Sequence, residues 1–270
     1  MTYVPFIPEI GAAYTLLGPD GTTVTFNDST DPNYGGILSD VTGLDSADVR
    51  ESGDVLVATD GGWHGNFYYG RRPITITGVL PNIVDAADRA TKLDRVRNAT
   101  NAMRADAILS WQNTAVGSVP MQTWVRRQQP ARFTGAWVKT FNILLVSQFA
   151  QLFSVALHTS ATAASVVVEN HGNSPAFPII SIHGAITAGV TVTNSTTGLV
   201  VQMLSTYSQS GGDVLTIDVL NHTATKNGAT TVNSYIDFVN STWPTVNKGL
   251  NTFSVPGGPT LSLAWRDTWS

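Results

Sequence analysis

The sequence predicts a mainly β protein in two parts, with one α-helix in the first part and a β-sandwich in the second. Charged residues form only 13% of the 270 residues and hydrophobic residues form 42%, while Thr, Ser, Asn and Gly fill most of the remainder. This composition is typical of strands joined by polar turns. Short alternating runs recur between turn signals, and only one longer stretch has helical spacing.

Strand signals open the first part. An Asp20-Gly21 turn precedes an alternation at Val24 and Phe26, and a second alternation places Ile74 and Ile76 on one face. Four further strands are expected in the runs "AILSWQ", "MQTWVRR", "ARFTGAWV" and "TFNILLV".

One amphipathic helix is expected between these strands, at about residues 83–105. Apolar residues recur at three- and four-residue spacing from Ile83 to Met103, which places them on one face. Asn82 is the expected N-cap, and Asp85 and Asp88 fall in the first turns, where a carboxylate is favourable.

The second part contains only short strands separated by regular turns, which favours a sandwich. The expected strands are "ASVVVEN", "PIISIHG", "VTVTNSTTG", "VLTIDVL", "YIDFVN", "NTFSV" and "LSLAW".

The distribution of charge places the boundary between the two parts. Residues 1–70 contain ten acidic residues and one basic residue, and residues 71–139 contain eleven basic and four acidic residues. Residues 140–270 contain only three basic and five acidic residues. This change in composition predicts domains at residues 1–158 and 159–270, with an exposed connection near Ser160 to Ser165.

Several classes of protein are disfavoured by composition. The chain has no cysteine, so a disulfide framework, a thiolate metal site and a cysteine nucleophile are excluded. Its first residues, "MTYVPFIPEIG", lack the basic start of a signal peptide, and synthesis in the cytoplasm is expected. Residues 140–168 carry no charged side chain, but Gln148, Gln151 and His158 interrupt them, so we expect strands and a linker rather than a membrane span.

The stretch "NHGNSPAFPIISIHG", residues 170–184, is the most suggestive candidate for chemistry. It holds His171 and His183, but neither has a third ligand at suitable spacing, and the nearest carboxylate in sequence is Glu169. Gly and Asn suit a left-handed turn, and Pro175 and Pro178 stiffen the start of a strand. We therefore expect a structural opening to the second domain, without metal or cofactor.

Catalytic motifs are likewise missing from the sequence. There is no Gly-x-Ser-x-Gly elbow, no phosphate loop and no His-Glu-x-x-His. A glycosidase needs two carboxylates flanking one bond, and each acidic residue of the second half suits a turn or strand end. Arg126, Arg127 and Arg132 with Trp124 and Phe133 resemble a nucleic-acid surface, but a pI of 5.6 opposes a dedicated nucleic-acid binder. We expect no enzyme activity and no specific nucleic-acid binding.

Several motifs resemble those of the distal tail proteins of long non-contractile tailed bacteriophages. The first part has the hairpin "LLGPDGTTVTFN", then "DGGWHGNFYYGRRPITITGVL", the helix and "FNILLVSQFAQLF". The second part resembles the family's galectin-like sandwich, which opens on an Asn-x-Gly-x-x-x-x-x-Pro-x-Ile pattern. The matching residues are Asn170, Gly172, Pro178 and Ile180 at the opening and Trp243, Gly249 and Asn251 at the close.

The resemblance implies an N-terminal β-barrel-like domain that forms a hexameric ring, and a galectin-like β-sandwich that projects outward. Such a ring is an adaptor at the phage tail tip, between the tail tube protein and the tail-tip hub protein, with receptor-binding proteins or fibres as further partners. Two alternatives remain open. One is a sugar-binding sandwich that recognises the host wall, although Pro175 replaces the arginine of the similar galectin motif His-x-Asn-x-Arg. The other is a tail-tube subunit, which stoichiometry per virion would distinguish.

The opposite charges of residues 1–70, with a balance of −9, and residues 71–139, with a balance of +7, suggest how a ring would assemble. A ring needs a heterologous interface, in which one face of each subunit meets a different face of the next. Opposite charge on the two faces would steer association. The expected subunit-interface residues are Asp45, Asp48, Glu51, Asp54, Arg89, Arg97, Arg126 and Arg127. Pairing of both segments within one subunit, or an acidic lining for a DNA channel, are the alternatives.

Overall fold

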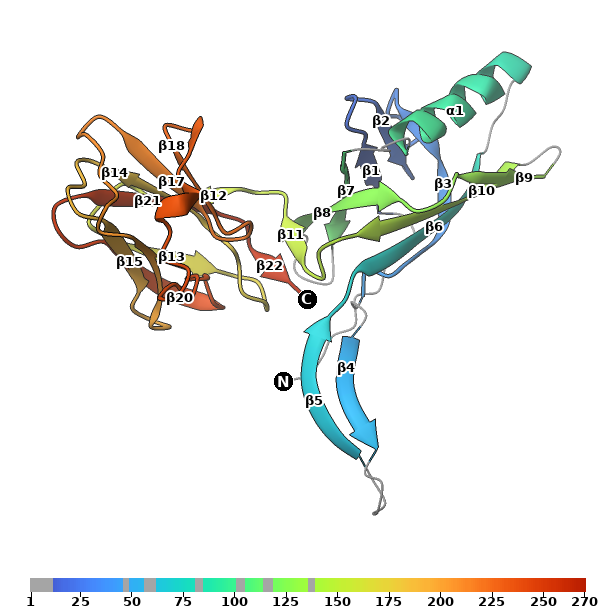
Figure 1. Cartoon of the computed structure of the whole chain (residues 1–270). Coiled ribbons are helices and arrows are strands. Elements are labelled where there is room, and N and C mark those ends of the chain that lie inside the picture. Colours follow the sequence, from blue (N-terminus) through green and yellow to red (C-terminus); the bar gives the residue numbers. More distant parts are fainter. Residues whose placement is uncertain are drawn as a thin grey trace. The chain divides into compact units, whose positions relative to one another are not determined.

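The protein consists of two compact units, 1–155 with Ser270 and 156–269 (Figure 1). The computed structural model describes residues 12–45, 49–55, 62–80, 85–100, 105–113, 119–135 and 139–270, and for 49–55 and 62–69 it describes the backbone alone. The described residues are mainly β, with one α-helix, as the sequence predicts. No helix among them is long and apolar enough to span a membrane.

Unit 1 is a β-barrel with one helix. Its strands are β1 (Tyr14–Leu17), β2 (Thr23–Phe26), β3 (Tyr34–Thr42), β4 (Val49–Val55), β5 (Gly62–Tyr69), β6 (Arg72–Leu80), β7 (Ala107–Asn113), β8 (Val119–Arg127), β9 (Arg132–Thr134), β10 (Lys139–Ser147) and β11 (Leu152–Ser154). Seven of them follow the order β8-β7-β1-β2-β3-β6-β10, and β10 pairs again with β8 at Val146 and Arg126. This closure pairs the two ends of the seven-strand set with each other, while β9, which pairs only with β10, remains at the end of the strand order.

The barrel interior follows from the alternation of the strands. Ile74 and Ile76 of β6 are fully buried, and Phe26 meets Phe141 with ring centroids 5.5 Å apart. Arg72 is also fully buried, and its Nε donates to the Ala150 carbonyl at 2.9 Å. Its Nη1 donates to the Gly43 carbonyl at 3.1 Å. A buried guanidinium is tolerated because backbone oxygens accept its hydrogen bonds.

The helix α1 (Ala86–Ala99) is shorter than predicted. Its N-cap is Asp85, whose Oδ1 accepts from the Asp88 backbone N–H at 2.8 Å, and its C-cap is Thr100. The expected cap Asn82 and the expected end Met103 lie outside the described residues.

The predicted apolar stripe of α1 covers the barrel only at its C-terminal end. Val96 and Ala99 are buried, whereas Ala87 and Ala90 are exposed. The helix contacts β2 and β3, and alanine side chains are too small to gain much from burial. The first turns of the helix therefore remain in contact with solvent.

Strands β4 and β5 form a separate two-stranded ribbon. They pair antiparallel from Val49 with Tyr69 to Val55 with Gly62, and the register shifts between Glu51 and Gly53. Among the described residues, no third strand joins this sheet. Figure 1 shows the ribbon extending away from the barrel strands of the same unit.

Unit 2 is a β-sandwich, as predicted. Its strands are β12 (His158–Thr159), β13 (Ser165–Asn170), β14 (Ile179–His183), β15 (Val190–Asn194), β16 (Leu199–Met203), β17 (Val214–Asp218), β18 (Thr223–Lys226), β19 (Thr230–Thr231), β20 (Gly249–Ser254) and β21 (Thr260–Trp265). The residues of unit 2 also include β22 (Thr268–Trp269), which joins neither sheet of the sandwich. One sheet has the order β12-β21-β14-β17-β18-β19 and the other β13-β20-β15-β16. Their inward side chains, including Ile180, Val192 and Phe253, form one continuous core.

One predicted strand of unit 2 is wrong. The run "YIDFVN" contains the end of a 3₁₀ turn, η1 (Asn233–Tyr235), a single bridge residue, Ile236, and then a turn at 238–240. Asp237 stabilises this turn, because its Oδ1 accepts from the backbone N–H groups of Val239 and Asn240 at 3.2 and 3.1 Å. Side-chain acceptors of this kind compete with a strand ladder.

The expected exposed connection near Ser160 to Ser165 is partly strand-like. The Ser160 backbone N–H donates to the Leu263 carbonyl at 2.9 Å, and that of Ala163 donates to Leu261 at 3.0 Å. Ala156 and Leu157 are exposed where the two units divide. The division into separately folding domains remains a prediction.

Limited proteolysis tests this division. We expect the first cleavage within about three residues of Ala156, because residues 155–157 are exposed where the two units divide. Residues 160–163 should resist cleavage, since their backbone is hydrogen-bonded to β21. Mass spectrometry of the fragments locates the cut. First cleavage inside β6 or β10, with 155–157 intact, would contradict two separable units.

Candidate functional site

The opening of unit 2 is held by the buried side chain of Asn170. Its Nδ2 donates to the carbonyls of Ser174 and Val246 at 2.8 and 3.0 Å. Its Oδ1 accepts from the Gly172 backbone N–H at 2.9 Å. One amide thus satisfies three backbone groups, two in the opening turn and one at Val246, which makes Asn170 a structural residue.

Gly172 is required by the close approach of another backbone. A Cβ at this position would lie 1.9 Å from the carbonyl oxygen of Thr268, a distance that real Cβ atoms do not show. The Ser174 backbone N–H donates to the same oxygen at 3.0 Å. The Asn and Gly of the opening pattern therefore have packing roles, as the sequence predicts.

The two histidines of this stretch do not come together. His183 lies on β14, and its Nε2 is 3.2 Å from the Ser262 hydroxyl. His171 instead has its Nδ1 3.5 Å from Asp267 Oδ2 and its Nε2 3.6 Å from Glu169 Oε2.

Asp267 also contacts a histidine that the sequence did not single out. His158 Nε2 lies 3.1 Å from Asp267 Oδ2, and its ring stacks on Trp265 with centroids 5.4 Å apart. Asp267 lies 109 residues from His158 in sequence, so no spacing pattern indicates this contact. Within the described ranges, no three such side chains are arranged to hold a metal ion.

The closing pattern of unit 2 is also structural. Asn251 is fully buried, and its Nδ2 donates to the carbonyls of Asn247 and Gly249. Asn194 donates to Asn251 Oδ1 at 3.1 Å and to the Thr245 carbonyl at 2.8 Å. Trp243 packs against the core at one end of the sandwich, as expected.

The carboxylates of unit 2 act as turn residues. Asp213 lies 2.7 Å from Lys226 Nζ, and hydrogen bonds from Lys226 and Asn227 lower the pKa of its carboxyl to about 2. Hydrogen bonds from Asn240 also lower the pKa of Asp237. The described carboxyls with a shifted pKa are all shifted downward, whereas a general acid requires a raised pKa.

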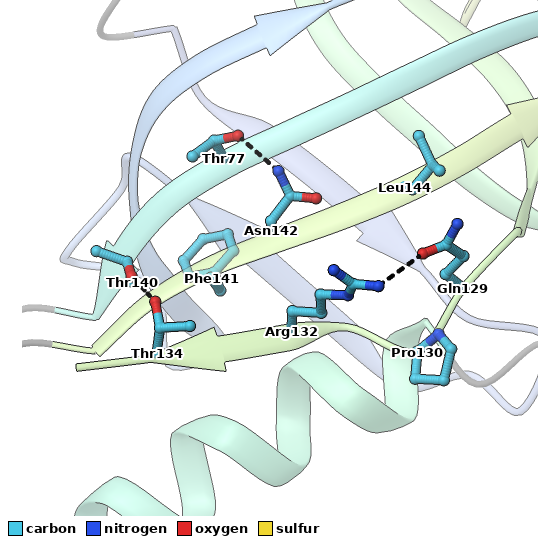
Figure 2. A pocket seen from close by; sticks show the side chains of 9 residues that line it. All are labelled: Thr77, Gln129, Pro130, Arg132, Thr134, Thr140, Phe141, Asn142 and Leu144. Atoms are coloured by element: carbon cyan, nitrogen blue, oxygen red, sulfur yellow. Dashed lines mark hydrogen bonds between the residues drawn. The ribbon is translucent and has the colours of Figure 1, made fainter. Parts of the chain in front are cut away.

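A groove of unit 1 lies on β6, β10 and β9 and has a volume of about 370 Å³. Figure 2 shows its side chains, with Asn142 Nδ2 donating to the Thr77 hydroxyl at 3.2 Å. Arg132 donates to Gln129 Oε1 at 3.4 Å. No carboxylate, imidazole or lysine lines the groove. Its chemistry suits polar contact rather than catalysis.

The basic residues of the predicted interface do not share one face. Arg126 and Arg127 are consecutive on β8, so their side chains leave opposite sides of the strand. Arg126 Nε contacts Asp106, a residue of its own basic segment. Arg97 contacts Asp94 at 3.3 Å, and Arg89 lies on the same helix.

The structure describes the acidic residues of the predicted interface less completely than the basic ones. Asp45 is exposed, and Asp48 lies outside the described residues. Glu51 and Asp54 lie on β4, the ribbon strand, but their side chains are not described. The structure therefore leaves the eight-residue interface as a prediction.

The aromatic residues of the basic segment have partners within unit 1. Trp124 meets Phe149 and Phe153 edge to face, with ring centroids 5.8 and 5.0 Å apart. The guanidinium of Arg97 lies over the ring of Phe133, 5.3 Å from its centroid. Because Trp124 and Phe133 already pack against side chains of unit 1, these contacts favour a structural role over stacking on nucleic-acid bases.

A family model connects unit 2 with known tail proteins. The model is described as "Siphovirus-type tail component, C-terminal domain" and matches residues 171–269. No curated protein matches the chain.

Solved structures extend the similarity to both units. The Dit protein (gp 19.1) of phage SPP1, described as a paradigm of the hub adsorption apparatus in phages that infect Gram-positive bacteria, is 12% identical, with a TM-score of 0.69. The alignment covers 95% of this chain and 99% of the SPP1 chain. A chain of the phage P2 baseplate, in its activated conformation with Ca, is 9% identical, with a TM-score of 0.52 and coverage of 94% and 97%. The corresponding structure with Sr is 10% identical, with the same TM-score and coverage.

These findings confirm the resemblance to distal tail proteins, and with it the barrel-plus-sandwich fold. They support a structural role in a phage tail or baseplate.

The opening of unit 2 yields a direct test. Asn170→Ala should lower the free energy of unfolding by about 3 kcal/mol, because buried carbonyls lose their donors. His171→Ala should lower it by less than about 1 kcal/mol, since exposed ion pairs contribute little. Chemical denaturation followed by tryptophan fluorescence measures both. Equal losses in the two variants would contradict a structural reading of Asn170.

Proposed function

We propose that the chain is the distal tail adaptor of a phage virion, a homo-hexamer in which unit 1 forms a ring. The ring would join the tail tube protein to the tail-tip hub protein, with receptor-binding proteins or fibres attached. The protein would be made in the cytoplasm of the bacterial host and act at the tail tip, without enzyme activity, cofactor or membrane insertion. The known tail-type fold and the geometry of the ribbon support this proposal.

The ribbon of β4 and β5 carries the argument for assembly. It has seven residues in one strand and eight in the other, and among the described residues it pairs with no further strand. An isolated two-stranded sheet is marginally stable in water, and its two outer edges present unpaired N–H and C=O groups. The seven barrel strands of the same unit pair with one another, and β8 and β10 close the set. A ribbon left open beside a closed barrel favours pairing with neighbouring subunits.

Charge supplies a second argument for the ring. Glu51 and Asp54 lie on β4, whereas Arg89 and Arg97 lie on α1. Opposite charge on different elements of one unit suits a heterologous interface and penalises like-on-like pairing. Because Arg126 and Arg127 leave opposite sides of β8, we expect only one of the two at a given contact.

Two other functions would lead to different results for copy number and for glycan binding. A tail-tube subunit would stack in many rings, so its copy number per virion would far exceed that of an adaptor. A sugar-binding sandwich that recognises the host wall would bind glycans as an isolated subunit, whether or not a ring forms.

Particle size and shape test the adaptor proposal. We expect light scattering coupled to gel filtration to give the mass of six chains, and negative-stain electron microscopy to show closed rings. Quantitative mass spectrometry of purified virions should give about one ring per tail. A stable monomer at every concentration, or open-ended stacks of rings, would overturn the proposal.

Salt dependence tests the charged interface itself. The screening length falls from about 8 Å at physiological salt to about 3 Å at 1 M, so ring assembly should slow and weaken as salt rises. Arg89→Glu should weaken assembly at low salt, and Glu51→Arg in the same chain should restore part of it. Arg132→Glu is the matched control, because Arg132 lies in the groove of unit 1 and outside the predicted interface. Assembly that is indifferent to salt, with no rescue by any acidic partner, would reject the charged interface but leave the adaptor proposal standing.

A further inference from the structure

Three aromatic rings gather in unit 2 around Trp243, which itself packs against the core. His222 stacks on Trp243 with ring centroids 4.0 Å apart and an interplanar angle of 13°. Phe238 lies beside the same indole at 5.9 Å and 47°. Phe238 keeps 55% of its surface exposed, and the neighbouring Val239 keeps 93%. We call His222, Phe238 and Trp243 the ring platform.

The backbone under the platform is in an unusual conformation at two positions. His222 has φ 54° and Trp243 has φ 55°, which is the left-handed region that large side chains rarely adopt. These two residues are the pair that stack on one another. Strain of this kind persists where surrounding contacts impose it, and it is often found at binding sites.

The segment that carries Phe238 is fixed along β16. The Asp237 backbone N–H donates to the Gln202 carbonyl at 2.9 Å, and those of Thr242 and Trp243 donate to the Val200 carbonyl at 2.8 and 3.0 Å. The Thr242 hydroxyl accepts from the Val200 backbone N–H at 2.9 Å. The exposed rings are therefore held in place before any ligand arrives, which lowers the entropic cost of binding.

Polar groups flank the platform at two turns, 218–221 and 237–240. Asp218 Oδ2 accepts from Asn221 Nδ2 at 2.8 Å, next to His222. Asp237 Oδ2 accepts from Asn240 Nδ2 at 2.7 Å, between Phe238 and Trp243 in sequence. Carboxylates and amides at the margin of an aromatic surface offer donors and acceptors to ligand hydroxyl groups.

The charge of unit 2 argues against an anionic ligand. Residues 140–270 contain only three basic residues, Lys226, Lys248 and Arg266. Lys226 is paired with Asp213, and the platform is flanked by Asp218 and Asp237. A phosphate- or carboxylate-rich polymer would meet the carboxylates of Asp218 and Asp237 at the turns that flank the platform.

We infer that the ring platform binds a neutral sugar ring. The C–H groups on the less polar face of a pyranose would pack on the exposed rings, whose faces carry partial negative charge. Its hydroxyl groups would reach the Asn and Asp side chains at the two turns. A protein partner is less favoured, because stable protein interfaces need about 800 Å² on each side and the platform consists of a few side chains.

This site differs from the galectin-like position at the opening of unit 2, where Pro175 stands in place of an arginine. It does not depend on ring assembly by unit 1, so the two proposals can fail separately.

His222→Gly is the most informative variant. Glycine adopts a positive φ without strain, so the substitution removes the ring while the unfolding midpoint stays unchanged or rises. Phe238→Ala removes the second exposed ring. Trp243 is left intact, because it packs against the core. Leu250→Ala is the matched control, since Leu250 is 64% exposed and lies on β20.

Calorimetry of the full-length protein should use neutral glucan, galactan and N-acetylglucosamine oligosaccharides, with a glycerol-phosphate polymer as the anionic arm. We expect saturable binding of at least one neutral oligosaccharide, and affinity about tenfold weaker in His222→Gly and in Phe238→Ala. Leu250→Ala should bind as the parent does. Absence of saturable neutral-sugar binding, binding of the anionic polymer alone, or equal affinity in all variants would overturn the inference.

Light scattering on the same samples separates this inference from the adaptor proposal. Hexamers that bind no sugar would refute the platform alone, and monomers that bind sugar would refute the ring alone.

Discussion

Three buried asparagine side chains hold the loops of unit 2 onto its sheets. A buried amide costs several kcal/mol unless its donors and acceptors are satisfied, so Asn170, Asn194 and Asn251 fix the backbone groups that they contact. Asn194 and Asn251 together anchor 245–249, directly after Trp243, and Asn170 joins the opening turn to Val246. The position of Trp243, and with it the ring platform, therefore depends on amides that touch no ligand.

Unit 1 is held together by a different constraint, the closure of its barrel. Seven strands satisfy one another, and Arg72 binds the Gly43 and Ala150 carbonyls from inside. Closure pairs the barrel strands with one another, so in the proposed ring the ribbon of β4 and β5, whose pairing the barrel does not complete, would supply open strand edges. Stability and association would then use separate elements, and the ribbon could be altered without opening the barrel.

The sequence predicted the strands in which apolar side chains recur at a regular spacing. Ile74 and Ile76 alternate and are buried, and in unit 2 the predicted runs include β13, β14, β15 and β17. The prediction missed β16, "LVVQM", and β18, "TATK". The polar side chains of β18 lack a period-two apolar signal. The prediction read residues 235–240 as a strand, because the alternation there is overridden by the hydrogen bonds of Asp237. The contact of His158 with Asp267 joins residues too distant for any local pattern, and only the fold brings them together.

One edge strand in each of the two sheets of unit 2 is covered by an adjoining segment. In unit 2, residues 158–163 bond to the outer side of β21, and residues 235–243 bond to the outer side of β16. Both segments occupy the side of an edge strand where a strand of another chain could otherwise pair. Soluble proteins commonly cover sheet edges in this way to avoid unwanted pairing. The segment on β16 is also the one that presents Phe238 to solvent. One loop thus covers the edge of β16 and exposes the ring of Phe238. The backbone hydrogen bonds that cover the edge also hold the segment that carries this ring. In the proposed assembly, the sandwich would contact a ligand through this loop, while the ribbon of unit 1 would contact a neighbouring copy.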